Sequence, residues 1–376
     1  MVKDAVCVTG MAWTTALGTG LPEVWDRLLA GEHGLRDLPS EHRLRNTWAA
    51  VVDDPPHVME PGSRLRALAR ETLARALADA KLTEEADAFA VIGTSFGAYL
   101  DDDTAALHRW AGEVAAATGL RRAPVVLSTA CSSGSDAIAV GADLIRSGAA
   151  PICVCGGVDV LTPAKRLGHT ALGTMSSTRL RPFDRRADGT LLGEGAGFVV
   201  LEAEESMRRR GVFSHAVLRG TGAANDAAGM TAPDPSGDSV VLAVERALAE
   251  GGLATADIAV INAHGSGTPA NDAVETRSFT RLFPGAHRPA VFATKPAFGH
   301  SLGATGALEA IALALALRHG CVPPVSGLEH VAEGFPLPLP VGGPLRIGPG
   351  AGLSLTLGFG GFNTCLVLSR GDRGVG

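Results

Sequence analysis

The stretch VVLSTACSSGSDAI, residues 125–138, passes from a short apolar run into a segment of small and helix-forming residues. The apolar run predicts a buried strand over 125–128, and the residues that follow predict a helix over 132–146. A strand that runs directly into a helix presents the side chain between them at a sharp turn, and here that side chain is Cys131. Free N–H groups and the helix dipole at this turn can stabilise a thiolate or an oxyanion. The small residues after Cys131 are expected to leave room for a substrate.

A lone cysteine is more often a small buried residue than a nucleophile. The strand–turn–helix setting reverses that preference for Cys131. A thiol suits acyl transfer because it is a good nucleophile and because the resulting thioester remains activated for attack by carbon. The turn therefore predicts an acyl-carrying cysteine.

The chain on either side of this turn alternates between strand and helix patterns. Short apolar runs predict strands at 5–9, 88–93, 152–156, 197–202, 258–263, 291–294, 353–357 and 365–368. Apolar residues at helical spacing predict helices at 21–30, 63–80, 240–249, 271–282 and 305–318, the second with Ser63 as its N-cap. This alternation predicts a mixed α/β sheet with helices on its faces. Since no clear linker interrupts it, we expect two closely packed halves, residues 1–210 and 211–376.

Two glycine-rich loops of the second half each place a histidine shortly after a predicted strand. NAHGSGT, residues 262–268, contains His264, and KPAFGHSLGA, residues 295–304, contains His300. Loops that follow strands are where α/β sheets carry their chemistry, so the two histidines are predicted to be catalytic. The other nine histidines lack such settings and are predicted to be solvated. A metal site is not expected, because no third ligand lies at suitable spacing.

A decarboxylating condensation would use these groups well. Loss of the carboxylate from a malonyl thioester leaves an enolate, whose oxygen the imidazoles of His264 and His300 can stabilise. The enolate carbon would then attack the acyl group on Cys131. Lys295 is expected to hold His300 in place and to adjust its protonation. Glu309 is expected to neutralise Lys295, because a buried ammonium otherwise resists ionisation.

Composition narrows the partners and the location. The net charge of −6 and the pI of about 6.0 argue against nucleic acid as the main partner. Six cysteines are scattered without zinc or disulfide spacing. The N-terminal residues show no export signal, and the apolar stretch 307–317 is too short to span a bilayer. We expect a soluble, reduced, cytoplasmic protein without a membrane partner.

Six ordered motifs, spread over almost the whole chain, make the sequence similar to the β-ketoacyl-acyl carrier protein synthases of the thiolase superfamily. They are VCVTGMAWTTALG (6–18), TACSSG (129–134), RPFDRRADGTLLGEGAGFVVLE (181–202), NAHGSGTPANDAVET (262–276), ATKPAFGHSLGATGALEA (293–310) and GFGGFN (358–363). The resemblance implies a thiolase-like five-layered αβαβα fold made of two duplicated halves. The first half would carry the nucleophile and the second the two histidines.

The resemblance also implies roles for individual residues. The positions that match the family's catalytic residues are Cys131, His264, His300 and Lys295, with Glu309 as the ion-pair partner of the lysine. Phe359 matches the gating phenylalanine, whose N–H joins that of Cys131 in an oxyanion hole. Ser266 and Thr268 match contacts to the phosphopantetheine arm, and Gly360 is assigned to substrate binding. No cofactor is implied, since the acyl carrier protein brings the phosphopantetheine with the substrate.

Within the family, the histidine pair favours a decarboxylative ketosynthase of type II polyketide or fatty-acid-like biosynthesis, and the motifs are closest to type II polyketide ketosynthases. The predicted partners are an acyl carrier protein and a second subunit, in a homodimer or in a heterodimer with a chain-length subunit. The alternative is an acyltransferase on the same fold that moves an acyl group through Cys131 to another nucleophile without decarboxylation. A non-catalytic subunit is disfavoured because Cys131 and both histidines are present. Two segments, 36–88 and 93–131, are shorter than the family pattern, and they shape the acyl pocket and the subunit interface.

Carrier proteins are acidic, so their docking surface is expected to be basic. Arg64, Arg66 and Arg70 lie on one predicted helix and are the candidate docking residues. A second cluster, 179–186, holds four arginines. For each cluster the alternative is a solvated face with structural ion pairs. Glu194, in the GEGAG segment, is expected to be structural.

Overall fold

The computed structural model describes residues 5–57, 59–82, 86–95 and 108–372. Ten strands pair into one mixed sheet. In the order in which they pair they are β10 (Ala290–Phe292), β9 (Ile258–Asn262), β13 (Ala351–Leu357), β14 (Phe362–Arg370), β8 (Ala216–Asn225), β1 (Val6–Thr14), β7 (Gly195–Ala203), β6 (Ile152–Asp159), β4 (Ala88–Gly93) and β5 (Val125–Leu127). Two short hairpins lie outside it, β2 (Leu35–Asp37) with β3 (Trp48–Ala50) and β11 (Cys321–Val322) with β12 (Leu345–Arg346).

The helices occupy the connections between these strands. They are α1 (Leu21–Leu29), α2 (Pro61–Asp79), α3 (Arg109–Ala117), α4 (Ser133–Arg146), α5 (Pro163–Ala171), α6 (Glu204–Arg210), α7 (Asp238–Gly251), α8 (Pro269–Leu282), α9 (Lys295–Phe298) and α10 (Thr305–His319). In the described parts of the chain, the 3-10 turns are η1 (Ala130–Ser132), η2 (Thr255–Asp257) and η3 (Leu302–Ala304).

The sheet consists of two five-stranded halves with the same internal order. From the shared edge outward, the first half runs β1, β7, β6, β4, β5 and the second runs β8, β14, β13, β9, β10. The pairings also correspond, because the two inner contacts of each half are antiparallel and the two outer contacts are parallel. The halves join where β1 pairs with β8. The duplication implied by the resemblance is therefore present in the topology.

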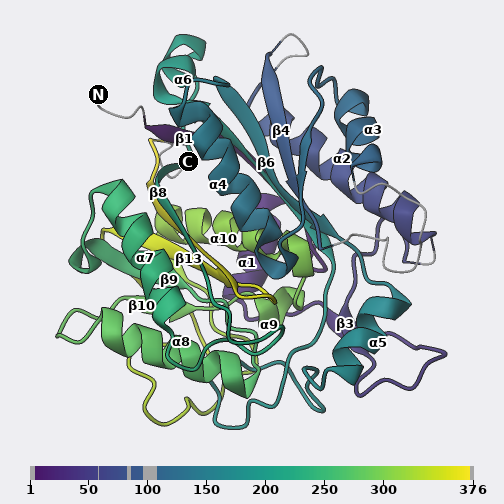
Figure 1. The fold of residues 1–376 in the computed structure, drawn as a ribbon, viewed down its shortest axis with the longest axis vertical. Coiled ribbons are helices and arrows are strands. Elements are labelled where there is room, and N and C mark those ends of the chain that lie inside the picture. Colours follow the sequence, from purple (N-terminus) through teal and green to yellow (C-terminus); the bar gives the residue numbers. More distant parts are fainter. Residues whose placement is uncertain (1–4, 58, 83–85, 96–107, 373–376) are drawn as a thin grey trace.

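Five layers follow from where the helices pack (Figure 1). Helices α2 and α3 cover the outer face of the first half-sheet, and α7 and α8 cover that of the second. Helices α4 and α10 lie between the two half-sheets, in the largest apolar cluster of the described residues. Every residue of α10 from Thr305 to Leu317 is buried, as expected for a helix that is apolar on all sides. The predicted αβαβα architecture is confirmed.

The segment Leu302–His319 is long and apolar enough to cross a membrane by length and composition alone, but 89% of it is buried inside the fold. It therefore serves as a core helix here.

Most predicted elements are present, with shifts at their ends. The helix predicted at 63–80 begins at Pro61, and its N-cap is Glu60 rather than Ser63. The Glu60 carboxylate accepts hydrogen bonds from the N–H groups of Gly62 and Ser63, at 2.6 and 2.7 Å. Strand β8 was not predicted, because apart from Leu218 the buried positions of its alternating pattern are alanine and glycine. Helices α3, α5 and α6 and the hairpin of β2 and β3 were not predicted either.

Candidate active site

Cys131 lies in η1, between the end of β5 and the first turn of α4, as the sequence predicted. The turn is sharp enough that Ala130 adopts a φ of 52°, a left-handed conformation that is uncommon for a residue with a side chain. The cysteine is 4% exposed, and the backbone N–H of Phe359 bonds to its sulfur. Burial raises the pKa of the Cys131 thiol to about 11, although the charge of Lys295 and the Phe359 N–H both lower it. Burial thus outweighs these two effects, and the thiol is neutral at pH 7.

Two of the small residues after Cys131, Gly134 and Ser135, pack against the second half of the chain. A Cβ atom on Gly134 would lie 2.9 Å from the carbonyl oxygen of Gly303, and the hydroxyl of Ser135 lies 2.8 Å from that of Thr356. Both neighbours belong to the second half of the chain. The small side chains therefore allow α4 to pack closely against the other half.

His264 follows β9 in a loop whose backbone is held by hydrogen bonds to Glu275. The Glu275 carboxylate accepts hydrogen bonds from the N–H groups of His264 and Gly265, at 2.7 and 2.8 Å, and from the side chain of Asn271 at 2.7 Å. Two buried carboxylates of α8 thus organise the glycine-rich loop, because Asp272 accepts in the same way from the N–H of Gly267 at 3.2 Å.

Lys295 contacts His264, whereas the sequence had suggested His300. Its Nζ lies 3.2 Å from His264 Nδ1 and also donates to the His264 carbonyl oxygen. The reason is that Lys295 follows β10, the parallel neighbour of the strand that leads into His264. Glu309 lies opposite the lysine, with 2.5 Å between Lys295 Nζ and its Oε1, and both side chains are 1% exposed. Because the ammonium donates to Nδ1, the proton of the neutral His264 ring is on Nε2.

His300 reaches the same tautomer by a different route. Its Nδ1 accepts a hydrogen bond from the backbone N–H of Leu302 at 3.1 Å and lies 3.2 Å from the hydroxyl of Thr305. Burial and the positive charge of Lys295 lower the pKa of both His264 and His300 well below 6.5, so both rings are neutral at pH 7. The ring centroids lie 5.5 Å apart. The site therefore contains two neutral imidazoles, each with its hydrogen on Nε2.

One pocket brings most of the predicted site residues together. It contains about 520 Å³ of empty space, including open solvent at its mouth, and its lining includes Cys131, His264, His300, Ser266, Thr268, Phe359 and Gly360. Lys295 and Glu309 do not line it and lie buried behind His264. The Ser266 and Thr268 hydroxyls are 3.1 Å apart, and that of Thr268 also caps α8 by accepting from the N–H of Asn271 at 3.4 Å. These two hydroxyls form one polar wall of the pocket.

The GFGGFN loop forms another wall of the pocket and needs its glycines for geometric reasons. Gly360 and Gly361 have φ values of 80° and 79°, which side-chain-bearing residues rarely adopt. A Cβ atom on Gly361 would also lie 2.0 Å from the carbonyl oxygen of Asp226. The two glycines let the loop turn so that the N–H of Phe359 faces Cys131.

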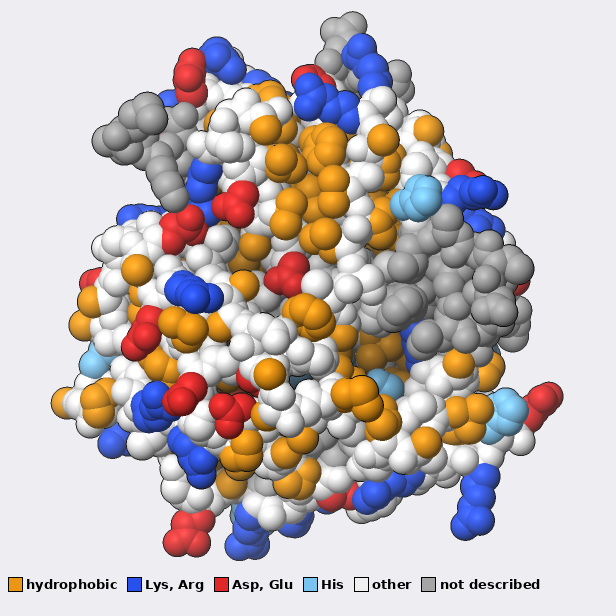
Figure 2. Space-filling model, in the orientation of Figure 1, with side chains coloured by type: hydrophobic (Ala, Val, Ile, Leu, Met, Phe, Trp, Pro, Cys, Tyr) orange, Lys and Arg blue, Asp and Glu red, His pale blue; other side chains and the backbone are white. Residues whose placement is uncertain are grey.

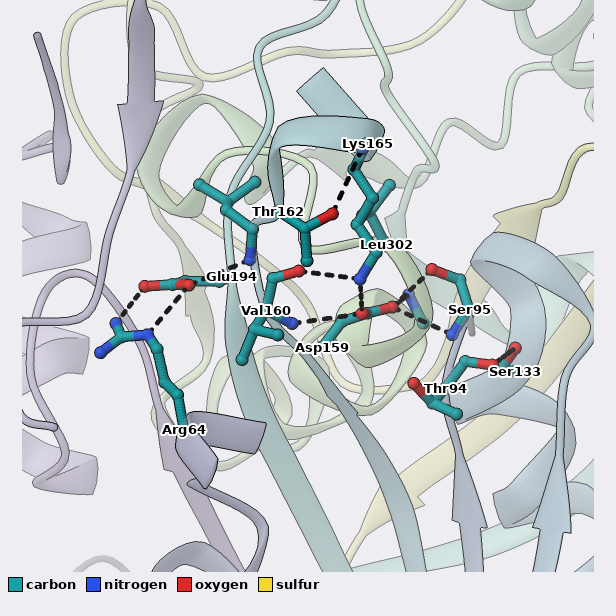
Figure 3. Close-up of polar contacts among 12 residues, drawn as sticks. Arg64, Thr94, Ser95, Ser133, Asp159, Val160, Thr162, Lys165, Glu194 and Leu302 are labelled. Carbon is teal, nitrogen blue, oxygen red and sulfur yellow. Dashed lines mark hydrogen bonds and ion pairs between the residues drawn. The ribbon is translucent and has the colours of Figure 1, made fainter. Parts of the chain in front are cut away.

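Of the three predicted docking residues, Arg64 is buried, so its assignment to the docking surface was wrong. Its guanidinium is 2% exposed and forms a buried ion pair with Glu194, which is itself 1% exposed (Figure 3). The pair is further fixed by the backbone of Val52, whose carbonyl oxygen accepts from Arg64 at 2.7 Å and whose N–H donates to Glu194 at 3.0 Å. The helix turns this position inward, so Arg64 joins α2 to the start of β7. Arg66 and Arg70, with side chains 40% and 55% exposed, stay predictions for docking.

Two features of the site were not predicted. His169 of α5, assigned to the solvated histidines, lines the pocket together with His264 and His300. Its position late in a short helix gave no signal. Asp159 and Lys165 form a buried ion pair, and Asp159 also accepts hydrogen bonds from the N–H groups of Ser95 and Gly303, at 3.0 and 2.9 Å. A carboxylate at the end of an otherwise apolar strand was the available signal for this pair.

Comparison with known proteins identifies the family. The family model described as the beta-ketoacyl synthase N-terminal domain matches residues 3–206, and that of the C-terminal domain matches residues 215–329. The chain is 33% identical to 3-oxoacyl-acyl-carrier-protein synthase 2 of Mycobacterium tuberculosis, over 97% of each chain. It is also 33% identical to the tetracenomycin polyketide synthase ketoacyl synthase alpha subunit of Streptomyces glaucescens, over 98% of this chain and 97% of that one.

Both alignments extend over more positions, 410 and 415, than the 376 residues of this chain, so the relatives contain insertions that it lacks. Among solved structures, the ishigamide ketosynthase/chain length factor is 29% identical with a TM-score of 0.90, covering 98% of this chain and 100% of that one. The matched domains, the relatives and the fold agree, and the chain belongs to the β-ketoacyl synthase family.

Proposed function

We propose that this chain is a ketosynthase that condenses an acyl group held on Cys131 with a malonyl unit carried by an acyl carrier protein. The observation that carries the proposal is the pocket itself, where a buried thiol and two neutral imidazoles with protons on Nε2 lie together. A nucleophile and two hydrogen-bond donors are what a decarboxylative condensation requires.

The reaction begins with transfer of the acyl group. The sulfur of Cys131 attacks the carrier thioester, a new C–S bond forms, and the carrier thiol leaves with the cysteine proton. During this transfer the carbonyl oxygen of the acyl group becomes negatively charged and needs hydrogen-bond donors. The N–H groups of Cys131 and Phe359 can supply them. Cys131 then holds the acyl group as a thioester.

Condensation follows when malonyl-carrier protein enters. Its carboxylate leaves as carbon dioxide, and the electron pair of the broken bond forms an enolate, whose oxygen accepts from Nε2–H of His264 and His300. The enolate carbon attacks the thioester on Cys131, and collapse of the tetrahedral adduct breaks the bond to the cysteine sulfur. The sulfur leaves as a thiolate and takes up a proton from solvent, which restores the thiol. The product is a β-ketoacyl group on the carrier. Both donors act as neutral rings, so they need no proton from solvent before decarboxylation.

Lys295 acts through His264 in this scheme. Its ammonium fixes the Nδ1 atom and carbonyl oxygen of His264, and Glu309 balances its charge in the buried site. We therefore assign Lys295 and Glu309 positioning roles, although the resemblance groups the lysine with the catalytic residues.

The partners belong to the same proposal. The phosphopantetheine arm of an acyl carrier protein would enter past Ser266 and Thr268, and no further cofactor is needed. A second subunit, identical or of the chain-length type, would cover the first half-sheet's edge. The edge strand of this half-sheet, β5, pairs only with β4 among the described residues. Figure 2 shows apolar side chains gathered near α4 on one face of the molecule. The tetracenomycin relative and the ishigamide structure, named for polyketide ketosynthases or chain length factors, support a type II polyketide branch.

The decisive experiment supplies acyl-carrier protein and malonyl-carrier protein and measures carbon dioxide and the β-ketoacyl product. We expect both in equal amounts, with any required partner subunit present. Loading of Cys131 without carbon dioxide release would instead support the alternative function, acyl transfer to another nucleophile.

Carrier docking is tested separately, on the exposed arginines of α2. Arg66→Glu and Arg70→Glu are expected to raise the KM for the carrier protein several-fold, because charge reversal weakens association with an acidic partner. Arg208→Glu on α6, where the side chain is 73% exposed, is the matched control. An unchanged KM in both α2 variants would remove this patch.

A further inference from the structure

The pocket contains a third imidazole that the proposed reaction does not use. His169 lies on α5 and lines the pocket together with Cys131 and His300. Its ring stacks on that of Phe359, with the centroids 5.6 Å apart and the planes inclined by 24°. The feature to explain is a polar ring in this position, since stacking alone would need no nitrogen.

His169 stands at the reacting end of the pocket. The residue on which it stacks, Phe359, donates its N–H to the Cys131 sulfur. His169 and His300 also line the same pocket, together with Cys131. A ligand atom that meets His169 therefore belongs to the part of the substrate close to the thioester.

The helix that carries His169 is rigidly anchored. Thr162 caps α5 by accepting from the N–H of Lys165 at 3.3 Å, and the Lys165 ammonium pairs with buried Asp159 (Figure 3). Arg166 donates to the carbonyl oxygens of Leu38 and Thr47, at 2.6 and 2.9 Å. His169 follows Lys165 by about one helical turn, so its position is set by these buried contacts.

The contacts of His169 determine which nitrogen faces the ligand as an acceptor. Its Nδ1 lies 2.9 Å from the hydroxyl oxygen of Thr174, and that hydroxyl lies 3.2 Å from the carbonyl oxygen of His169. If Thr174 gives its single proton to the carbonyl, Nδ1–H must donate to the hydroxyl oxygen, and this arrangement satisfies both contacts. Nε2 then carries a lone pair. Burial lowers the pKa of His169 to about 4, so the ring keeps that lone pair at neutral pH.

We propose that His169 is a specificity-determining residue that accepts, through Nε2, a hydrogen bond from a hydroxyl or N–H group close to the thioester carbonyl of the acyl chain loaded on Cys131. Within the described residues, no protein group bonds to Nε2 of His169. A saturated chain would remove water from this nitrogen without replacing the bond, which disfavours it relative to a chain with a donor. The inference rests on the proposed role of Cys131 as the acyl carrier.

The test compares two acyl-carrier proteins whose chains have equal length, one saturated and one with a 3-hydroxyl group. The kcat/KM for transfer to Cys131 is measured by intact mass, as the ratio of hydroxylated to saturated chain. We expect wild type to favour the hydroxylated chain, and His169→Phe to reduce the ratio roughly 3- to 10-fold, since it keeps the stacking but loses the acceptor. His169→Gln, whose amide oxygen reaches the Nε2 position, is expected to retain the preference.

An unchanged ratio in His169→Phe would overturn the proposal. If the ratio is unchanged because kcat/KM falls equally for both chains, His169 contacts the shared phosphopantetheine arm instead of the acyl chain. If His169→Phe does not fold, His169→Asn replaces it, since its shorter amide reaches only the Nδ1 position. Transfer to Cys131 needs no decarboxylation, so a protein that loads with this preference but releases no carbon dioxide would count against the proposed function alone.

Discussion

The two halves of the molecule use the same turn for different purposes. In the first half η1 leads into α4, and in the second η3 leads into α10, at corresponding positions of the duplicated topology. Each turn contains a non-glycine residue in the left-handed region, Ala130 with a φ of 52° and Leu302 with a φ of 51°. The strained turn is therefore a property of the repeated fold, and it does not by itself mark a nucleophile.

What differs is the residue that follows. Cys131 comes after Ala130, whereas Gly303 comes after Leu302, where its N–H donates to the buried Asp159 at 2.9 Å. The second half also inserts a longer connection between strand and turn, and this connection holds Lys295 and His300. One half thus supplies the thiol from its turn, and the other supplies His300 from the connection that leads into the equivalent turn. The proposed division of roles between thiol and imidazole would then arise from changes on a common backbone.

The largest effect is expected when the two turns are made alike. Cys131→Gly gives the first turn the residue of the second, so the backbone should tolerate it, and acyl loading should fall by at least about 10⁴-fold because the nucleophile is gone. Malonyl decarboxylation at the two histidines should continue. Intact mass and carbon dioxide release measure the two activities, and any acyl adduct on the variant would refute the assignment of Cys131.

The second prediction removes what only the second connection supplies. His300→Ala should lower malonyl decarboxylation by about 10²–10³-fold, the usual effect of losing one donor to a developing oxyanion. Loading of Cys131 should be kept within a few-fold, and it serves as the control for folding. Full decarboxylation in this variant would show that His264 alone stabilises the enolate.

The contrast between the two turns also explains what could be predicted from the sequence. Cys131 and His264 stand in short motifs just after strands, and His300 stands in a glycine-rich connection a few residues further from its strand, so the apolar runs before them are enough to locate all three. The contact of Lys295 with His264 depends on which strands are neighbours in the sheet, and this is decided by pairings between distant segments. Arg64 was misassigned for the same reason, since the helical period shows which residues share a face but not which face is covered. His169 could not be placed from the sequence, because its helix is held by hydrogen bonds from Arg166 to Leu38 and Thr47, more than a hundred residues away in sequence.

A third prediction concerns the glycine of the second turn. A Cβ atom on Gly303 would lie 2.4 Å from the backbone nitrogen of Ser95, so Gly303→Ala must displace the backbone next to Asp159. We expect the free energy of unfolding to fall by about 1–3 kcal/mol, as for other overpacked sites. Gly112→Ala on α3, where nothing lies within 4 Å of the new methyl group, is the matched control and should be neutral or slightly stabilising. Urea denaturation measures both, and equal stabilities would show that the close approach at Gly303 is easily relieved.

The smallest effect on activity is expected from a substitution of Thr305, the first residue of α10. Thr305 corresponds to Ser133 of the first half, but the Ser133 hydroxyl bonds within its own turn, 2.6 Å from the carbonyl oxygen of Ala130, whereas the Thr305 hydroxyl lies 3.2 Å from His300 Nδ1. Thr305→Val should lower decarboxylation by roughly 3- to 10-fold, the effect of one neutral hydrogen bond, because the Leu302 N–H still fixes the tautomer of His300. Thr305→Ser keeps the hydroxyl and should retain the rate. A loss in the valine variant as large as that of His300→Ala would mean that the hydroxyl, and not the backbone of the strained turn, sets the protonation of the His300 ring.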